Sequence, residues 1–279
     1  MRSFGLTTKV RMTAAFFVLI SSSSLAAGEG LGQVSSNTTK RRPEGPWAPD
    51  ILRLNADIRR NPNSARAFYN RGCAWSKRSM HDRAIADYNN AIRLNPGHVG
   101  AYVNRGNARL EQGAYNQAIA DSTEAIHLAS NQALAGVPAA TSAMDAYLIR
   151  GSAWLGKGLN DKAIADFTEA LRLDASCANA YYNRGISWLK MGNLDRAIAD
   201  FDNAILFDPK RVGAYVNRGS TWFNKGEYDK AIRDYTEAIY LDPNDASIYG
   251  GRGNAWAAKG DRYKAEADYR QSDFLKNKK

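Results

Sequence analysis

The chain has 279 residues, of which 44% are hydrophobic and 24% are charged, and its formal net charge is +10. These proportions are ordinary for a globular protein of one or two domains. Basic residues gather at the two ends of the chain: Arg2, Lys9 and Arg11, and again Lys276, Lys278 and Lys279. Because so much of the charge lies outside the body of the chain, it forms no basic stripe, and we expect no nucleic-acid partner.

The first 27 residues have the features of a secretory signal peptide. Arg2, Lys9 and Arg11 precede the short apolar run 14–20, and small residues follow as far as Ala27. The apolar run is much shorter than the ~20 residues of a spanning helix. We therefore expect residues 1–27 to be a signal peptide and the protein to be exported, either periplasmic or secreted. The alternatives are a signal that is not cleaved and tethers the chain to a membrane, or an organellar transit peptide.

Residues 28–47 are rich in Gly, Ser, Thr and Pro, which predicts a flexible linker. Residues 48–64 follow with a helical pattern that ends at Asn61-Pro62. This segment is similar to the second helix of an incomplete hairpin, and we expect an N-terminal capping helix.

An Arg-Gly dipeptide recurs six times in the rest of the chain. Its arginines are at 71, 105, 150, 184, 218 and 252, which gives a spacing of 34 residues except for 45 between the second and the third. A fixed period in this range predicts a solenoid of stacked hairpins. The longer spacing contains an insertion at 133–143, rich in Ala.

Other residues keep fixed offsets from each repeat glycine. An aromatic residue stands four positions before it, a Trp three after it, an Ala twelve after it and an aromatic residue sixteen after it in most units. The second unit departs from this pattern, because Arg109 and Ser122 replace the two aromatic residues that follow the glycine. We therefore expect a loosened joint where this unit meets the insertion.

This pattern resembles the tetratricopeptide repeat (TPR) family. The resemblance covers residue 65 to the C-terminus and implies an all-α fold, a right-handed α-solenoid of six helix hairpins. The units are 65–98, 99–132, 144–177, 178–211, 212–245 and 246–279. The last unit has Glu266 and Asp273 where the others have Ile or Leu, so we expect its second helix to form the solvent-facing end of the array.

Each arginine of the Arg-Gly dipeptides has an aspartate sixteen residues later, for example Arg184 and Asp200. A row of arginines could hold an anionic ligand. The matched pairing favours a structural interpretation, in which each pair is a salt bridge between the two helices of one hairpin.

TPR arrays characteristically bind extended segments in a concave groove lined by their first helices. The resemblance therefore implies that the residue two positions before each repeat glycine faces a groove. The candidate peptide- or partner-binding residues are Asn70, Asn104, Asn183, Asn217, Tyr69, Tyr182 and Asn107. An asparagine carries both a donor and an acceptor for a peptide backbone. In the third unit, Ile149 takes the position of these asparagines two residues before the glycine. An alternative is that the asparagines have local structural roles.

Nothing in the sequence predicts catalysis. The only histidines, His81, His98 and His127, form no metal-binding motif, and no phosphate-binding loop occurs. Cys73 and Cys177 lie three repeats apart, so we expect unpaired thiols, no metal site and no cofactor. We predict a non-catalytic scaffold that binds a protein or peptide partner and no small-molecule substrate. The alternative is a structural subunit that stabilises one fixed envelope assembly through its convex face.

Overall fold

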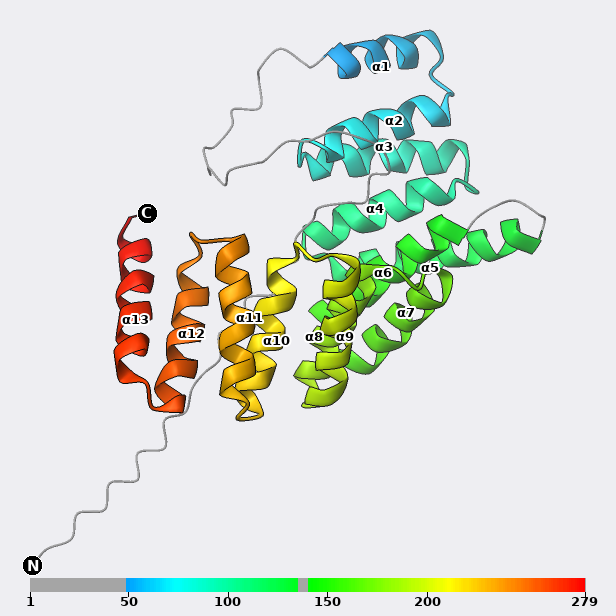
Figure 1. Ribbon diagram of the computed structural model, residues 1–279. Helices are drawn as coiled ribbons and strands as arrows, with labels where there is room; N and C mark the ends of the chain where they lie inside the picture. Colours follow the sequence, from blue (N-terminus) through cyan, green and yellow to red (C-terminus); the bar gives the residue numbers. More distant parts are fainter. Residues whose placement is uncertain (1–48, 135–139, 279) are drawn as a thin grey trace, which may run out of the picture. The chain divides into compact units, whose positions relative to one another are not determined.

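The structure is a computed structural model that describes residues 49–134 and 140–278, and within them the chain forms only α-helices (Figure 1). The expected signal peptide at 1–27 and linker at 28–47 lie outside the described residues. Helix α1 spans Pro49–Arg60, inside the expected capping segment. It is followed by α2 (Ala65–Ser76), α3 (His81–Leu94), α4 (Val99–Glu111), α5 (Tyr115–Leu134), α6 (Ala140–Gly156), α7 (Asn160–Leu173), α8 (Ala178–Lys190), α9 (Leu194–Phe207), α10 (Val212–Asn224), α11 (Tyr228–Leu241), α12 (Ala246–Lys259) and α13 (Arg262–Asn277).

The expected all-α array of helix hairpins is confirmed. Each of the six units contributes an antiparallel pair, beginning with α2 and α3, and each pair packs against the next. A single hairpin leaves one apolar face uncovered, and stacking buries it against the neighbouring hairpin. Helix α1 packs on α2, in the place that the second helix of a preceding unit would take.

The turn inside each hairpin needs a left-handed backbone seven residues after the repeat glycine. Glycine supplies it in five units, at Gly113, Gly158, Gly192, Gly226 and Gly260. In the first unit, Ser79 holds the same position with φ 56°, a conformation that costs a residue with a Cβ atom ~1 kcal/mol.

The repeat glycines let the two helices of a hairpin approach each other across an aromatic ring. A Cβ atom added at Gly185 would lie 2.8 Å from the ring of Phe201, which is fully buried. At Gly72 the same atom would lie 2.6 Å from the ring of Tyr88. Real Cβ contacts are not this short, so any larger residue in place of the glycine would clash with the ring.

The insertion mostly lengthens two helices. Residues 133–134 belong to α5, which has 20 residues, and residues 140–143 belong to α6, which has 17, whereas α3 has 14. One buried cluster joins Val103 and Ala118 of the second unit to Ile149 of the third. The expected loosened joint is therefore not seen in the described residues, because the longer helices pack together and keep the core continuous.

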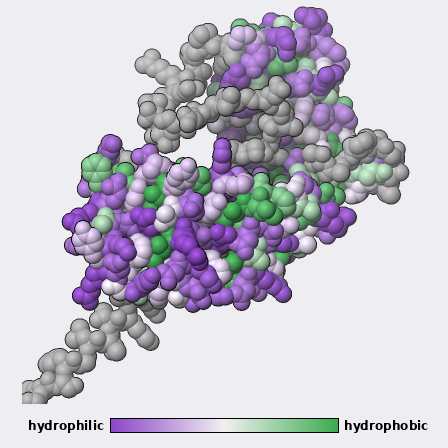
Figure 2. Space-filling model, viewed as in Figure 1, coloured by the Kyte–Doolittle hydropathy of each residue, from purple (hydrophilic) through white to green (hydrophobic). Residues whose placement is uncertain are grey.

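The last helix, α13, has an exposed outer face. Glu266 and Asp273 both lie on the surface, as the sequence predicts for the end of an array. The face of the molecule drawn in Figure 2 is mainly hydrophilic, with smaller hydrophobic areas between the charged residues. Among the described residues, no helix has the length and apolar character needed to span a membrane.

Candidate functional site

The six arginines of the Arg-Gly dipeptides bind their aspartates in the way that the structural interpretation predicts. Arg184 donates from Nε and Nη2 to the two carboxylate oxygens of Asp200, each at 2.8 Å. The same two-bond contact occurs in every unit and joins Arg71 to Asp87, Arg105 to Asp121, Arg150 to Asp166, Arg218 to Asp234 and Arg252 to Asp268. Each pair links the first helix of its hairpin to the second.

The third nitrogen of each arginine reaches into the preceding unit, a contact that the sequence did not suggest. Nη1 of Arg184 donates to Thr168 of α7 at 3.1 Å. In the other units the acceptors on the preceding helix are Asn55, Asn89, Thr123, Asp202 and Thr236. Because Asn55 lies on α1, the capping helix accepts this bond as a repeat helix does. The arginines thus hold three helices together and are not free for an anionic ligand.

The tryptophans of the repeats lie under cations from the same hairpin. Lys230 Nζ lies 4.3 Å from the ring centre of Trp222, and Lys162 lies 4.6 Å from that of Trp154. The second unit lacks both the ring and the cation, with Arg109 and Gln117 at these positions. Arg109 instead donates to Asp121 at 2.7 Å, so that this aspartate binds two arginines.

Two of the candidate binding asparagines bond to tyrosines of the preceding unit. Asn104 Nδ2 donates to Tyr69 Oη at 3.1 Å and to Cys73 Sγ at 3.3 Å. Asn217 Nδ2 donates to Tyr182 Oη at 3.1 Å. These contacts tie neighbouring first helices together and leave less of each amide for a partner.

The other candidate asparagines keep their amides available. The side chains of Asn70, Asn107 and Asn183 make no hydrogen bond within the part of the chain that the structure describes. Asn70 is exposed, and Asn107 and Asn183 are half-buried. We use the name first-helix face for the surface that the first helices of the hairpins form around residues 70, 104, 107, 183 and 217 on α2, α4, α8 and α10 and residue 145 on α6.

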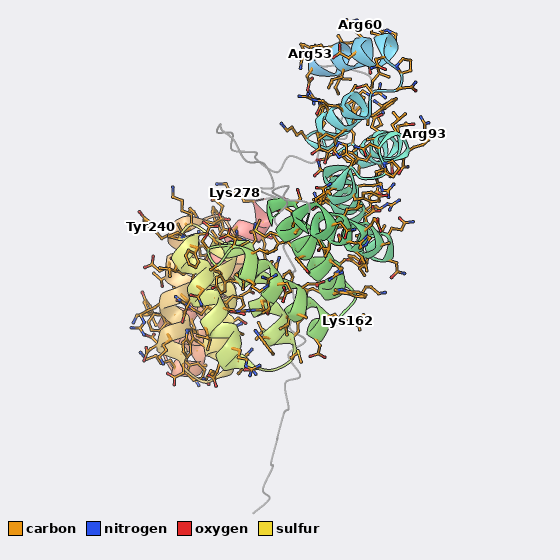
Figure 3. All side chains as sticks on the ribbon, turned by 90° about the vertical axis from the view of Figure 1, so that its right-hand side faces the viewer. Arg53, Arg60, Arg93, Lys162, Tyr240 and Lys278 are labelled. Atoms are coloured by element: carbon orange, nitrogen blue, oxygen red, sulfur yellow. The ribbon has the colours of Figure 1, made fainter. Side chains whose placement is uncertain are left out.

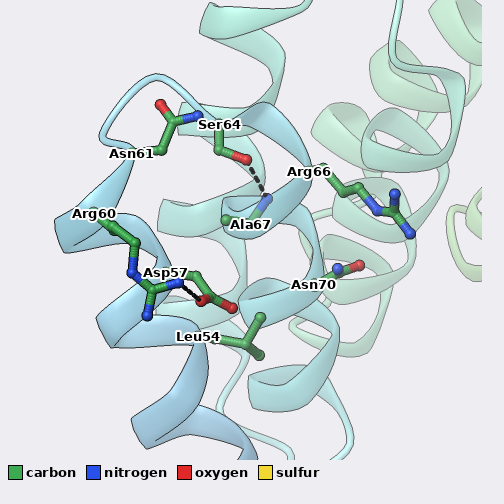
Figure 4. Close-up of a pocket in the computed structure, with 8 residues that line it drawn as sticks. All are labelled: Leu54, Asp57, Arg60, Asn61, Ser64, Arg66, Ala67 and Asn70. Atoms are coloured by element: carbon green, nitrogen blue, oxygen red, sulfur yellow. Dashed lines mark hydrogen bonds and ion pairs between the residues drawn. The ribbon is translucent and has the colours of Figure 1, made fainter.

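A pocket of about 330 Å³ lies at the N-terminal end of the first-helix face, between α1 and α2. Asn70 and Arg66 line it on the α2 side, and Asp57 and Arg60 line it on the α1 side (Figure 4). Asp57 and Arg60 pair with each other at 3.4 Å, whereas Asn70 makes no such contact. The pocket therefore offers an amide and a guanidinium group to a ligand.

Asp145 of α6 is a candidate functional residue that the sequence reasoning missed. It stands six positions before its repeat glycine, on the same helix face as Ile149 one turn later. Its side chain is half-buried and makes no ion pair or hydrogen bond to the described residues. Burial alone raises the pKa of its carboxyl group to about 6. The signal available in the sequence was a lone acidic residue where two other units have glycine, Gly100 and Gly213.

A second surface feature lies on the second helices. The residue 21 positions after the repeat glycine is Leu206, Tyr240 and Phe274 in the last three units, and these side chains are 68%, 82% and 59% exposed. We call these three residues the apolar ridge. In the first three units the same position holds Arg93, His127 and Arg172, all exposed. Figure 3 labels Arg93 and Tyr240 at the outside of the array.

Neither cysteine is in a disulfide, and both side chains are half-buried. Within residues 49–134 and 140–278, no group of three His, Cys, Asp or Glu side chains is arranged to hold a metal ion.

This architecture, with paired helices of fixed 34-residue period and a glycine packed on an aromatic ring, defines a tetratricopeptide-type solenoid. Two family models, both described as Tetratricopeptide repeat, match the chain. One matches residues 65–98, 178–211 and 212–245, and the other matches residues 145–177. These stretches therefore carry tetratricopeptide repeats. No curated protein sequence matches the chain.

Solved structures share the fold. YrrB, described as a TPR protein with an unusual peptide-binding site, is 23% identical with a TM-score of 0.54, over 74% of this chain and 97% of YrrB. MamA from Desulfovibrio magneticus RS-1 is 19% identical with a TM-score of 0.57, over 65% of this chain and 96% of that one. A chain of the APC/C hetero-tetramer Cut9-Hcn1 is 18% identical with a TM-score of 0.64, over 82% of this chain and 43% of that one.

Proposed function

We propose that this protein is a non-catalytic scaffold that binds an extended segment of a partner protein on its first-helix face. The observation that carries the proposal is the half-buried amide of Asn183, which has no hydrogen-bond partner among the described residues. The Asn183 amide is open to solvent, and the backbone of a bound segment would supply a partner for both its donor and its acceptor.

The fold supports the same proposal. Six hairpins present their first helices side by side, and Asn70 and Asn107 add two more amides on α2 and α4. YrrB, which shares the fold, is described as having a peptide-binding site. Because Asn104 and Asn217 bond to tyrosines, the asparagines two positions before a repeat glycine that stay available are Asn70 and Asn183, and Asn107 is available on the same face.

Site-specific photo-crosslinking in the native cell tests this use of the first-helix face. A photoreactive residue placed at position 183 should form a discrete adduct with a partner protein. A matched probe at position 165, an exposed site on the second helix α7, should not form it. The double substitution of Asn70 and Asn183 by Ala should weaken capture of the same partner. Equal adducts from both probes, with capture unchanged by the double substitution, would reject the proposal.

The apolar ridge favours a second function, that of a structural subunit that docks through its second helices. Three large exposed apolar side chains at one repeat position are unusual, since single exposed apolar residues are normally scattered. Substitution of Leu206, Tyr240 and Phe274 by the polar residues of the first three units should then abolish assembly while crosslinking at position 183 persists. If assembly survives this change, the ridge is not the docking surface.

We also propose that the protein is exported to the cell envelope or secreted, with residues 1–27 as its signal. The basic start and the short apolar run 14–20 support this proposal. Fractionation and N-terminal sequencing of the native chain test it. A mature protein that begins near residue 28 in the exported fraction is the expected result. An intact Met1 in a membrane fraction would indicate an uncleaved tether, and an intact chain in the cytosol would reject export.

A further inference from the structure

We infer that Asp145 is a specificity-determining residue that binds a lysine or arginine side chain of the partner segment. The inference rests on the proposed function, because it assigns the chemistry of a segment held on the first-helix face. It follows from how this carboxylate differs from the other buried carboxylates of the array.

The fully buried carboxylates of the described residues are all paired with arginine. Asp87, Asp121, Asp166, Asp200, Asp234 and Asp268 are at most 6% exposed as residues, and each accepts two hydrogen bonds from the arginine of its unit. Asp145 is half-buried too, yet no lysine or arginine among the described residues pairs with it. Other half-buried carboxylates without a cation, Asp174, Asp242 and Asp245, each accept a backbone N–H of their own turn. Asp145 is the half-buried carboxylate of the described residues that accepts neither a hydrogen bond nor an ion pair.

The surroundings of Asp145 come from more than one unit but bring no positive charge. Burial raises the pKa of the Tyr69 hydroxyl of α2 and of the Cys177 thiol before α8, and the charge of Asp145 adds a smaller rise to both. Both groups are neutral at neutral pH. Asp145 therefore lies within electrostatic reach of a side chain of the first unit and of the last residue of its own third unit, and neither group offsets its charge.

Binding of a cation would remove this imbalance. A partly desolvated carboxylate attracts an ammonium or guanidinium group more strongly than an exposed one does, because water screens the pair less. The solvation cost of Asp145 has already been met during folding, so less remains to oppose an ion pair when a partner arrives. A half-buried side chain remains reachable from solvent, as this role requires.

The test uses the full-length chain and degenerate peptide pools with blocked ends, each with one fixed residue: Lys, Arg, Gln or Glu. Wild-type protein should retain the Lys and Arg pools about tenfold better than the Gln and Glu pools. Asp145→Asn should remove this preference but keep the level of binding seen with the Gln pool. Asp161→Asn, which changes an exposed carboxylate at the start of α7, is the matched control and should keep the preference.

The outcomes separate this inference from the function on which it rests. If the wild type binds all four pools equally, or if Asp145→Asn keeps the preference, the first-helix face binds peptides but Asp145 does not select them, and the inference is wrong. If no pool is retained, the proposed function fails and the inference fails with it. If cationic peptides bind only after Lys40, Arg41 and Arg42 are changed to Gln, the chain's own N-terminal segment is the occupant, which also overturns the inference.

Discussion

Asn217 of α10 donates a hydrogen bond of 3.1 Å to the hydroxyl of Tyr182 on α8, in the preceding unit. Asn104 of α4 makes the same contact to Tyr69 of α2, between the second and the first unit. Each asparagine is 35 residues after its tyrosine. Beside each hydroxyl lies a glycine, where a Cβ atom would be 2.7 Å away at Gly213. The pair is therefore a junction between repeats, built from residues that the family pattern places in a binding groove.

We expect Asn217→Ala to lower the free energy of unfolding by about 1 kcal/mol, because the buried Tyr182 hydroxyl would lose its partner. Asn183→Ala should change it by less than about 0.5 kcal/mol, since the Asn183 side chain has no bond to lose within the described chain. Urea denaturation of the two variants beside the wild type measures both values. Equal destabilisation by the two changes would contradict the distinction between structural and available asparagines.

Asp145→Asn should stabilise the chain, and the gain should depend on pH. The folded state holds the Asp145 proton more tightly than an exposed aspartate does, because its pKa is about 6 compared with the ordinary 3.8. The wild type therefore loses stability as the pH rises between these two values and regains none above them. The variant carries no such charge, so its advantage in Tm should be a few degrees at about pH 8 and should vanish near about pH 4.

Asp161→Asn is the control for this measurement, because it removes an exposed carboxylate from the same unit. Its Tm should follow the wild type at both pH values. A wild type that is as stable as Asp145→Asn at the higher pH would mean that the carboxylate is compensated, and it would also weaken the case for a cationic partner residue.

The fold could be predicted from the sequence because its determinants repeat. Gly185 and Phe201 keep their offset in most units, and the Arg184–Asp200 pair keeps its offset in all six. A contact that recurs at one spacing is visible without a structure. No Arg-Gly dipeptide precedes α1 to set its register. Asn55 could therefore be matched to a repeat position only from its hydrogen bond with Arg71.

The candidate site was less predictable, because its useful residues differ from unit to unit. The sequence places Asn104 and Asn183 at equivalent positions, and only the neighbouring side chain decides which of them bonds internally. Tyr69 meets Asn104, whereas Leu148 stands at the tyrosine position that precedes Asn183. The isolation of Asp145 could not be predicted either, since it depends on the absence of a cation from every surrounding helix.

Ser122→Ala should leave the chain as stable or raise the free energy of unfolding by up to about 1 kcal/mol. Ser122 is fully buried where most units have an aromatic ring, and its hydroxyl has no hydrogen-bond partner in the described part of the chain. Removal of a buried hydroxyl without a partner removes its desolvation cost. Ser187, equally buried, bonds to the carbonyl oxygen of Asn183 at 3.0 Å. Ser187→Ala should therefore destabilise the chain, and thermal unfolding of the two variants distinguishes them.

Ser79→Gly should stabilise the chain by about 1 kcal/mol, because Ser79 alone among the equivalent turn residues keeps a left-handed backbone without being glycine. The reverse change, Gly158→Ser, should cost about the same at the turn of the third unit. A Cβ atom at Gly158 would meet nothing within 4 Å, so the cost there is one of backbone conformation and not of a clash. Chemical denaturation of both variants gives the two energies. If Gly158→Ser is tolerated without loss while Ser79→Gly brings no gain, the turns do not need glycine, and the first unit differs from the others for another reason.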